Sequence, residues 1–222
     1  MTNDLEEISE DKKKYAYQRC IYYKAHCLQH KIYKSGNIED MKQCVRLYEE
    51  ALGLALEENK LIVDIMLRVG IAYYNLGLFK NDEEILKISI KVLESALEEE
   101  EKNQEELITE IHRILGYCYQ ELSNYCDREE YLKKSLEELD YVFYENSKEN
   151  NKYSKGVNIS IMIFRASVLR KLNELNFNEN YKIKAIDDLN NVIKYYKKYA
   201  AYYKFNRTMA YFEIFKISNS EE

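Results

Sequence analysis

The stretch LRVGIAYYNLG at residues 67–77 returns in altered form as RILGYCYQELS at residues 113–123. In both, an aliphatic residue precedes a glycine, a tyrosine follows three residues after the glycine, and a leucine follows three after that. This spacing places the three residues on one face of a helix. Gly70 and Gly116 each lower intrinsic helix propensity by about 1 kcal/mol relative to alanine. We therefore expect each glycine to make a close contact with a neighbouring helix.

A second kind of helical face alternates with the first along the chain. It carries a large residue, then a smaller or slender one three positions later, as in the pairs Tyr48/Ala51, Leu93/Ala96, Leu132/Ser135 and Leu189/Val192. A small residue on one helix that faces a large residue on the next lets the two helices cross closely. Weaker versions of the first face surround Ala25 and Ala166. The pattern predicts four helical hairpins.

The breaks between these segments are short and polar, and the chain has no proline. Turns are expected at KSGN (34–37) and FKND (79–82), and a longer polar loop is expected at 146–156. Because no stretch shows sustained alternation of apolar and polar residues, strands are not expected. The prediction is an all-α antiparallel helical-hairpin array, an α-solenoid of about nine helices. A charged flexible arm is expected at 1–14, the repeat domain at 15–217 and a flexible tail at 218–222.

The first face followed by the second resembles the tetratricopeptide repeat (TPR). That family places Leu-Gly/Ala and then Tyr on its first helix, and an aromatic residue three before Ala on its second. The spacing here is about 46 residues, compared with 34 in the family, and the closing proline is absent. The resemblance implies that the first helices line a concave groove that binds a peptide or a segment of a partner protein.

The side chains expected to line this groove are found by counting positions along each first helix from its small residue. They are Tyr22, His26, His30, Arg68, Tyr74, Asn75, Arg113, Tyr117, Gln120 and Arg170. Arginine suits such a role because its guanidinium binds carboxylates with two parallel hydrogen bonds. His26 and His30 share a helical face, but no third metal ligand accompanies them, so we interpret them as groove or packing residues. No metal and no cofactor are expected.

Other sequence features bear on three alternative functions. YEEALGLALEENK (48–60), followed by 67–77, resembles the C-terminal helices of 14-3-3 proteins, whose groove binds phosphopeptides; their Arg-Tyr pair would fall near Tyr23 and Lys24. IKYYKKYAAYYKFNR (193–207) interleaves bases with aromatics, as RNA-binding surfaces do. An enzyme is disfavoured, because no phosphate loop, nucleophile elbow or paired Glu-x-x-His motif is present.

Charge and cysteine content indicate the compartment. Net charge is −6, distributed as −4 over 1–10, +6 over 11–48, −14 over 49–150, +8 over 151–210 and −2 over 211–222. The five cysteines follow no metal spacing and are expected to be reduced and mostly buried. No secretory signal or transmembrane helix is expected. We therefore expect a cytoplasmic adaptor that binds a protein or peptide, with no membrane contact and with nucleic acid disfavoured; a homodimer stays open.

Overall fold

The computed structural model describes residues 9–55, 61–99, 105–148, 154–198 and 204–218, and within these ranges it contains nine helices and no strand. The helices are α1 (Glu10–Ser35), α2 (Ile38–Gly53), α3 (Ile62–Lys80), α4 (Glu83–Glu98), α5 (Glu105–Leu122), α6 (Arg128–Ser147), α7 (Ser154–Asn176), α8 (Glu179–Lys198) and α9 (Lys204–Ser218). The prediction of an all-α hairpin array is confirmed. Helix α1 begins at Glu10, inside the arm predicted for 1–14. Of the loop predicted at 146–156, residues 149–153 lie outside the described residues, whereas α6 continues to Ser147 and α7 begins at Ser154.

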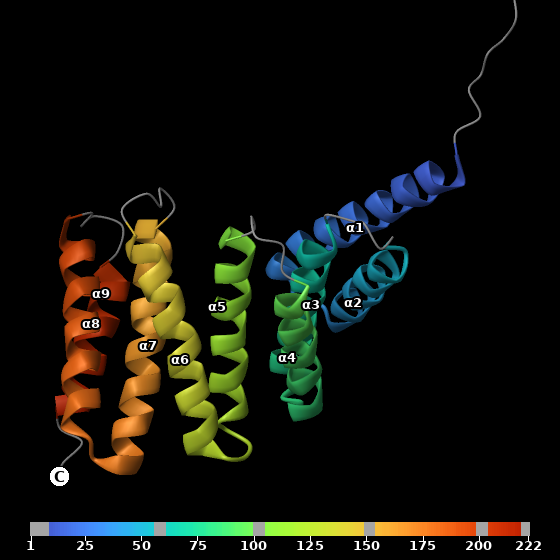
Figure 1. Cartoon of the computed structure of the whole chain (residues 1–222). Helices are drawn as coiled ribbons and strands as arrows, with labels where there is room; N and C mark the ends of the chain where they lie inside the picture. Colours follow the sequence, from blue (N-terminus) through green and yellow to red (C-terminus); the bar gives the residue numbers. More distant parts are fainter. Residues whose placement is uncertain (1–8, 56–60, 100–104, 149–153, 199–203, 219–222) are drawn as a thin grey trace, which may run out of the picture. The chain divides into compact units, whose positions relative to one another are not determined.

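The chain divides into two compact units, Met1–Ile111 and His112–Glu222. In the first unit α1 packs on α2, α2 on α3 and α3 on α4. In the second unit α6 packs on α7, α7 on α8 and α8 on α9 (Figure 1). Each unit therefore buries its own apolar core between consecutive helices.

Polar caps set the helix ends in place of proline. Asn37 accepts hydrogen bonds from the backbone N–H groups of Glu39 and Asp40, at 2.8 and 3.1 Å. Asp82 caps α4 in the same way through the N–H groups of Glu84 and Ile85. Gly36 adopts φ +60° just after α1, a left-handed conformation that suits glycine at a helix C-terminus. The turns predicted at 34–37 and 79–82 are confirmed.

The repeated glycines lie beneath large side chains of the following helix. A Cβ built on Gly70 would lie 2.5 Å from Leu93 Cδ2, and one built on Gly116 would lie 2.9 Å from Leu139 Cδ2. The expected close contact is confirmed at both positions. In α6, however, the residue over Gly116 is Leu139, whereas the large residue that the sequence pattern pairs with Ser135 is Leu132. The two leucines are seven residues apart and share a helical face, so periodicity alone does not distinguish them.

In three hairpins, a hydrogen bond also joins the first helix to the second. Ser89 Oγ donates to the carbonyl oxygen of Gly70 at 2.8 Å, and Ser135 Oγ donates to that of Gly116 at 2.7 Å. In the first hairpin the Cys44 thiol lies 3.5 Å from the carbonyl oxygen of Ala25. Donor and acceptor are 19 residues apart each time. This constant spacing shows that the three hairpins share one packing register.

Two expectations from composition need correction. Only Cys44 and Cys118 are buried, whereas Cys20 and Cys27 are exposed and Cys126 lies between, all five as free thiols. Helix α3 is long and apolar enough to cross a membrane by composition alone, although no such helix was expected. Half of its most apolar window is buried inside the first unit, as in the core helix of many proteins that do not span membranes.

Candidate partner-binding surfaces

In the first unit, polar side chains of α1 and α3 meet on a surface that we call the α1–α3 polar surface (Tyr22, His26, His30, Asp64 and Arg68). The Tyr22 hydroxyl donates to Asp64 Oδ2 at 2.6 Å, and Arg68 Nε lies 3.5 Å from Asp64 Oδ1. Tyr22, His26 and His30 share a face of α1 because they are spaced by four residues. The structure thus brings together four of the predicted groove residues: Tyr22, His26, His30 and Arg68.

Rings line this surface along α1. His26 is stacked parallel to Tyr22 at 6.3 Å and contacts His30 edge-on at 4.8 Å between ring centroids. Burial and the hydrogen bond to Asp64 raise the pKa of Tyr22 to about 12. Burial, with the nearby Arg68 and His30, lowers the pKa of His26. Tyr22 therefore stays a neutral donor, and the imidazole of His26 favours its neutral form.

Two buried nitrogens on this surface lack hydrogen-bond partners. His26 Nδ1 and Arg68 Nε are both shielded from solvent, and no group within the described part of the chain accepts or donates a hydrogen bond to either. Buried polar atoms are nearly always paired, so such atoms need an explanation. Arg68 Nε still lies 3.5 Å from Asp64 Oδ1, so its charge has a counter-charge although the geometry is not that of a hydrogen bond.

Two further predicted residues belong to the first unit. Tyr74 and Asn75 are half-buried on α3. The hydroxyl of the adjacent Tyr73 donates to Glu49 on α2. Whether Tyr74 and Asn75 contact a partner stays a prediction.

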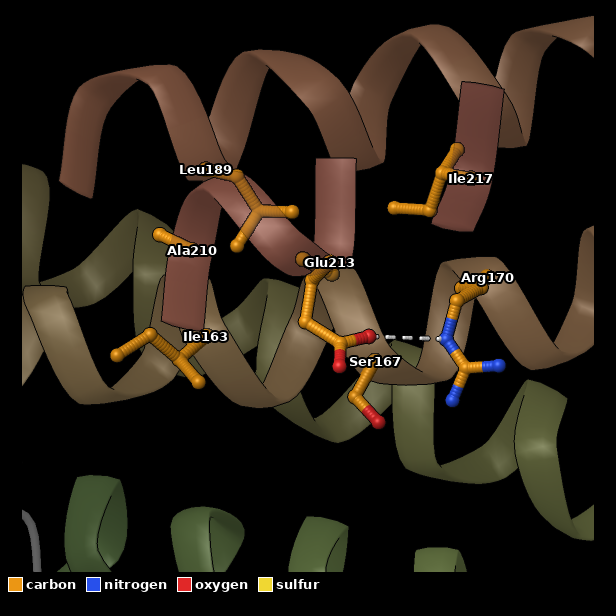
Figure 2. Close-up of a pocket in the computed structure, with 8 residues that line it drawn as sticks. Ile163, Ser167, Arg170, Leu189, Ala210, Glu213 and Ile217 are labelled. Carbon is orange, nitrogen blue, oxygen red and sulfur yellow. Dashed lines mark ion pairs between the residues drawn. The ribbon is translucent and has the colours of Figure 1, made fainter. Parts of the chain in front are cut away.

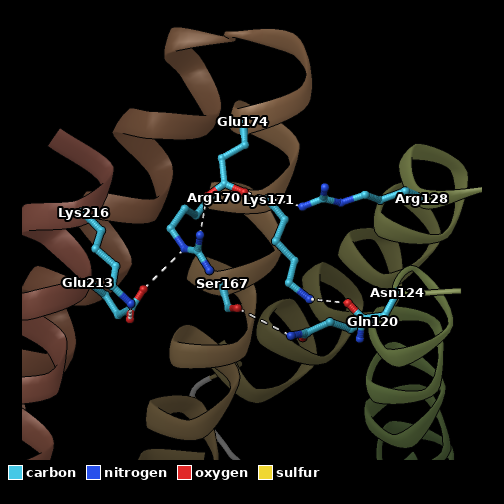
Figure 3. A network of polar contacts seen from close by, with 9 residues as sticks. All are labelled: Gln120, Asn124, Arg128, Ser167, Arg170, Lys171, Glu174, Glu213 and Lys216. Atoms are coloured by element: carbon cyan, nitrogen blue, oxygen red, sulfur yellow. Dashed lines mark hydrogen bonds and ion pairs between the residues drawn. The ribbon is translucent and has the colours of Figure 1, made fainter. Parts of the chain in front are cut away.

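In the second unit, α5 and the turn that follows it contact α7 through three successive pairs. The rings of Tyr117 and Phe164 are stacked at 4.0 Å, Gln120 Nε2 lies 3.5 Å from Ser167 Oγ, and Lys171 Nζ lies 3.5 Å from Asn124 Oδ1. Figure 3 shows the last two pairs. Tyr117 and Gln120 are only 6% and 7% exposed, so their surface is used for packing against α7 and little of it is open to a groove. Arg113 lies over the Tyr117 ring at 5.2 Å.

Arg170 lies at the centre of an ionic network on the same helix. Its Nη1 contacts Glu174, and its Nε lies 3.3 Å from Glu213 Oε2 on α9 (Figure 3). Burial lowers the pKa of the neighbouring Lys171. Arg170 is therefore held by carboxylates on two helices of the second unit, whereas Arg68 belongs to the first unit.

A pocket of about 380 Å³ opens beside Arg170 between α7, α8 and α9. Its walls are aliphatic, from Ile163, Ala166, Leu189, Ala210 and Ile217. Ser167, Arg170 and Glu213 supply its polar atoms, and Figure 2 shows the Arg170–Glu213 contact at its edge. Sequence reasoning found only Arg170 here. In the sequence, the small residues Ala166 and Ala210 are the feature that could have indicated this pocket. Only the packing of α9 shows that both of them border it.

The other predicted sites have these outcomes. Within the described residues, no group of three or more His, Cys, Asp or Glu side chains is placed to hold a metal ion. Tyr23 and Lys24, the positions compared with 14-3-3 proteins, are exposed on α1. Most of the basic aromatic segment 193–207 falls where side chains are not described, so RNA binding there stays a prediction.

No model of a known protein family matches the chain, and no curated protein matches it by sequence. Among solved structures, it is similar to a de novo designed helical repeat protein. The match covers 94% of this chain and 93% of that chain, at 13% identity and a TM-score of 0.28. At that score the similarity carries no argument about function, and the assignment of a helical repeat array rests on the helices and contacts described above.

Proposed function

We propose that this chain is a non-catalytic protein-interaction module whose α1–α3 polar surface binds an acidic segment of a partner protein. The observation that carries the proposal is the pair of buried nitrogens on Arg68 and His26 that lack hydrogen-bond partners among the described residues. The Arg68 side chain is 30% exposed, so a carboxylate from a partner would bind its guanidinium by a charge-assisted hydrogen bond, which is about twice as strong as a neutral one.

Charge supports the same partner chemistry. Residues 11–48, which include most of α1, carry a net charge of +6. A basic region attracts acidic segments and speeds their encounter. The exposed rings of Tyr23 and Tyr33 on α1 add apolar contact area next to these charges.

We further infer that the hairpins are divergent tetratricopeptide repeats. The support is the close contact of Gly70 and of Gly116 with a leucine of the following helix, in the order that the family's pattern requires. In that family the first helices of the hairpins bind partner segments, which is the role proposed here for α1 and α3. A cytoplasmic location is part of the same proposal and is supported by the five free cysteines.

The experiment compares two charge reversals in the same unit. Binding of a fluorescent glutamate-rich peptide is measured by anisotropy for wild type, Arg68→Glu and Arg46→Glu. Arg46 is exposed on α2, so its reversal changes net charge equally without touching the α1–α3 polar surface. We expect Arg68→Glu to weaken binding by about tenfold or more, as for loss of a charged hydrogen bond, and Arg46→Glu to have a small effect.

pH gives a second readout of the same surface. Protonation of His26 adds a positive charge beside Arg68, so acidic-peptide binding should strengthen as pH falls below about 6.5. The His26→Gln variant should lose this dependence. Equal loss of binding in both arginine variants, or a pH profile unchanged by His26→Gln, would show that general charge attraction is responsible and would reject this surface.

A further inference from the structure

The pocket between α7, α8 and α9 combines an apolar interior with one cation and one anion. Five aliphatic residues line a volume of about 380 Å³, which is within the range of small-molecule binding sites. A cavity of about 150 Å³ lined by aliphatic and aromatic groups holds one benzene. The present pocket therefore has room for a two-ring group together with a short polar head.

The ion pair at its edge is poorly formed. Arg170 Nε lies 3.3 Å from Glu213 Oε2, yet this buried nitrogen has no hydrogen-bond partner with acceptable geometry among the described residues. A hydrogen bond needs alignment as well as proximity. The Arg170 Nε–H is thus a buried donor that still needs an acceptor.

Each charge also has a second partner outside the pocket. Arg170 Nη1 contacts Glu174 on its own helix, and Glu213 Oε1 is bonded to Lys216 Nζ at 2.9 Å (Figure 3). When a ligand separates Arg170 from Glu213, neither group is left without a counter-charge. The contact between them can therefore open at low cost.

We propose that this pocket binds a small zwitterion with a bulky apolar side chain, an α-amino acid of about the size of tryptophan. Its carboxylate accepts from Arg170 Nε–H, its ammonium donates to the Glu213 carboxylate, and its side chain fills the space between Ala166, Leu189 and Ala210. A ligand with only one charge would satisfy one member of the pair and leave the other facing an apolar group. The zwitterion matches both.

Isothermal titration calorimetry on the full chain tests this with four probes. L-Tryptophan carries all three features, 3-indolepropionate lacks the ammonium, tryptamine lacks the carboxylate, and L-alanine lacks the bulky group. We expect L-tryptophan to bind and each of the others to bind about tenfold more weakly or not at all. Absence of L-tryptophan binding overturns the proposal, and so does equal affinity for any of the other three.

Variants locate the binding within the pocket. Arg170→Gln and Glu213→Gln should each weaken L-tryptophan binding by about tenfold, while Arg128→Gln should leave it unchanged. Arg128 contacts Glu174 from α6 at 3.5 Å but does not line the pocket, so it is a matched control. Circular dichroism checks folding, and if Arg170→Gln is unfolded, Glu213→Gln on α9 decides the question. Wild-type affinity in a folded Glu213→Gln variant rejects the site.

The two proposals fail separately. The acidic-segment surface belongs to the first unit and the zwitterion pocket to the second. Arg68→Glu should not change L-tryptophan binding, and Glu213→Gln should not change binding of the glutamate-rich peptide. If L-tryptophan binding is lost in Arg68→Glu while the variant remains folded, the ligand is not held at Arg170 and the pocket proposal is wrong.

Discussion

Arg165 in the second unit and Arg68 in the first are both largely buried arginines on the first helix of a hairpin, but their surroundings differ. Arg165 donates twice to Asp188, at 2.7 and 2.5 Å, once to Asp140 at 3.0 Å, and stacks on Phe143. Arg68 has one carboxylate, Asp64, at 3.5 Å, and a buried Nε without a hydrogen bond among the described residues. Arg165 is thus fully bonded within the fold, whereas Arg68 has a longer ion pair and an Nε outside hydrogen-bonding geometry.

The packing between first helices shows the same contrast. Tyr117 stacks on Phe164 and Gln120 meets Ser167 in the second unit, all neutral groups. In the first unit the corresponding contact joins Tyr22 to the charged Asp64. The position of each residue can be counted from the small residue of its own helix, which is Ala25, Gly70, Gly116 or Ala166. In both units, the two residues of a pair then differ by three positions. The register is therefore the same, and side-chain identity decides whether a given pair is neutral or charged.

The largest expected effect is at Arg165. Arg165→Ala leaves Asp188, which is 4% exposed, as an unpaired buried carboxylate, and breaking such a pair costs about 3–5 kcal/mol of unfolding free energy. Arg68→Ala should cost less than about 1 kcal/mol, because its ion pair is long and partly exposed. Urea denaturation followed by circular dichroism measures both. Similar losses for the two arginines would remove the contrast between them.

The same variant has a defined pH signature. Burial already raises the pKa of Asp188 above its usual value despite Arg165, and loss of Arg165 would raise it further. A carboxyl with a raised folded-state pKa contributes stability below its unfolded pKa of about 3.9 and loses it as pH rises. The loss of unfolding free energy in Arg165→Ala, relative to wild type, should therefore increase from about pH 4 to pH 7. Adding Asp188→Asn to Arg165→Ala should remove this pH-dependent increase in the loss of stability. If the increase persists in the double variant, a group other than Asp188 causes it.

Gly70 gives the next largest effect. Gly70→Ala places a Cβ 2.5 Å from Leu93 Cδ2, a side chain with no exposed surface. Overpacking of about 1–3 kcal/mol exceeds the gain in helix propensity of about 1 kcal/mol, so a net loss of about 1 kcal/mol is expected. Gly53 in α2 has no atom within 4 Å of a built Cβ, and Gly53→Ala should stabilise by a few tenths of a kcal/mol. A melting temperature that rises in both variants would contradict the close contact.

The interhelical hydroxyl bonds come third. Ser89→Ala and Ser135→Ala each remove one buried hydrogen bond, with an expected cost of about 0.5–1.5 kcal/mol. Thr109, whose hydroxyl bonds within α5 and is exposed, provides a control that should change little on conversion to alanine. Chemical denaturation of the three variants tests whether the shared register contributes to stability in both units.

The smallest expected effect is the titration of His26. Its lowered pKa means that the folded state favours the neutral ring. This contribution to stability is present above the unfolded pKa of about 6.5 and is lost as pH falls through it. The melting temperature of wild type should fall slightly more than that of His26→Gln between about pH 7 and pH 5. Parallel pH profiles would indicate that His26 is not shielded by Tyr22 and Arg68.

Much of the fold was predictable because helix periodicity and polar breaks are local properties of the chain. The hairpins, the turns at 34–37 and 79–82 and the contacts at Gly70 and Gly116 follow from them. The candidate sites were predictable only in part. Tyr22, His26 and Arg68 do meet, because one face of α1 and one face of α3 carry them. Tyr117 and Gln120 were expected to line a groove, and they are buried because α7 covers that face of α5.

By itself, the sequence determined which residues share a helical face and where the turns at 34–37 and 79–82 fall, since these depend on spacing along one chain. Only the tertiary structure decided that Leu139 lies over Gly116, that Arg165 is fully bonded while Arg68 is not, and that Ala166 and Ala210 border one pocket. The physical reason is that contacts between helices depend on their relative axial position. Residues seven apart look alike in a periodic pattern, and packing selects one of them.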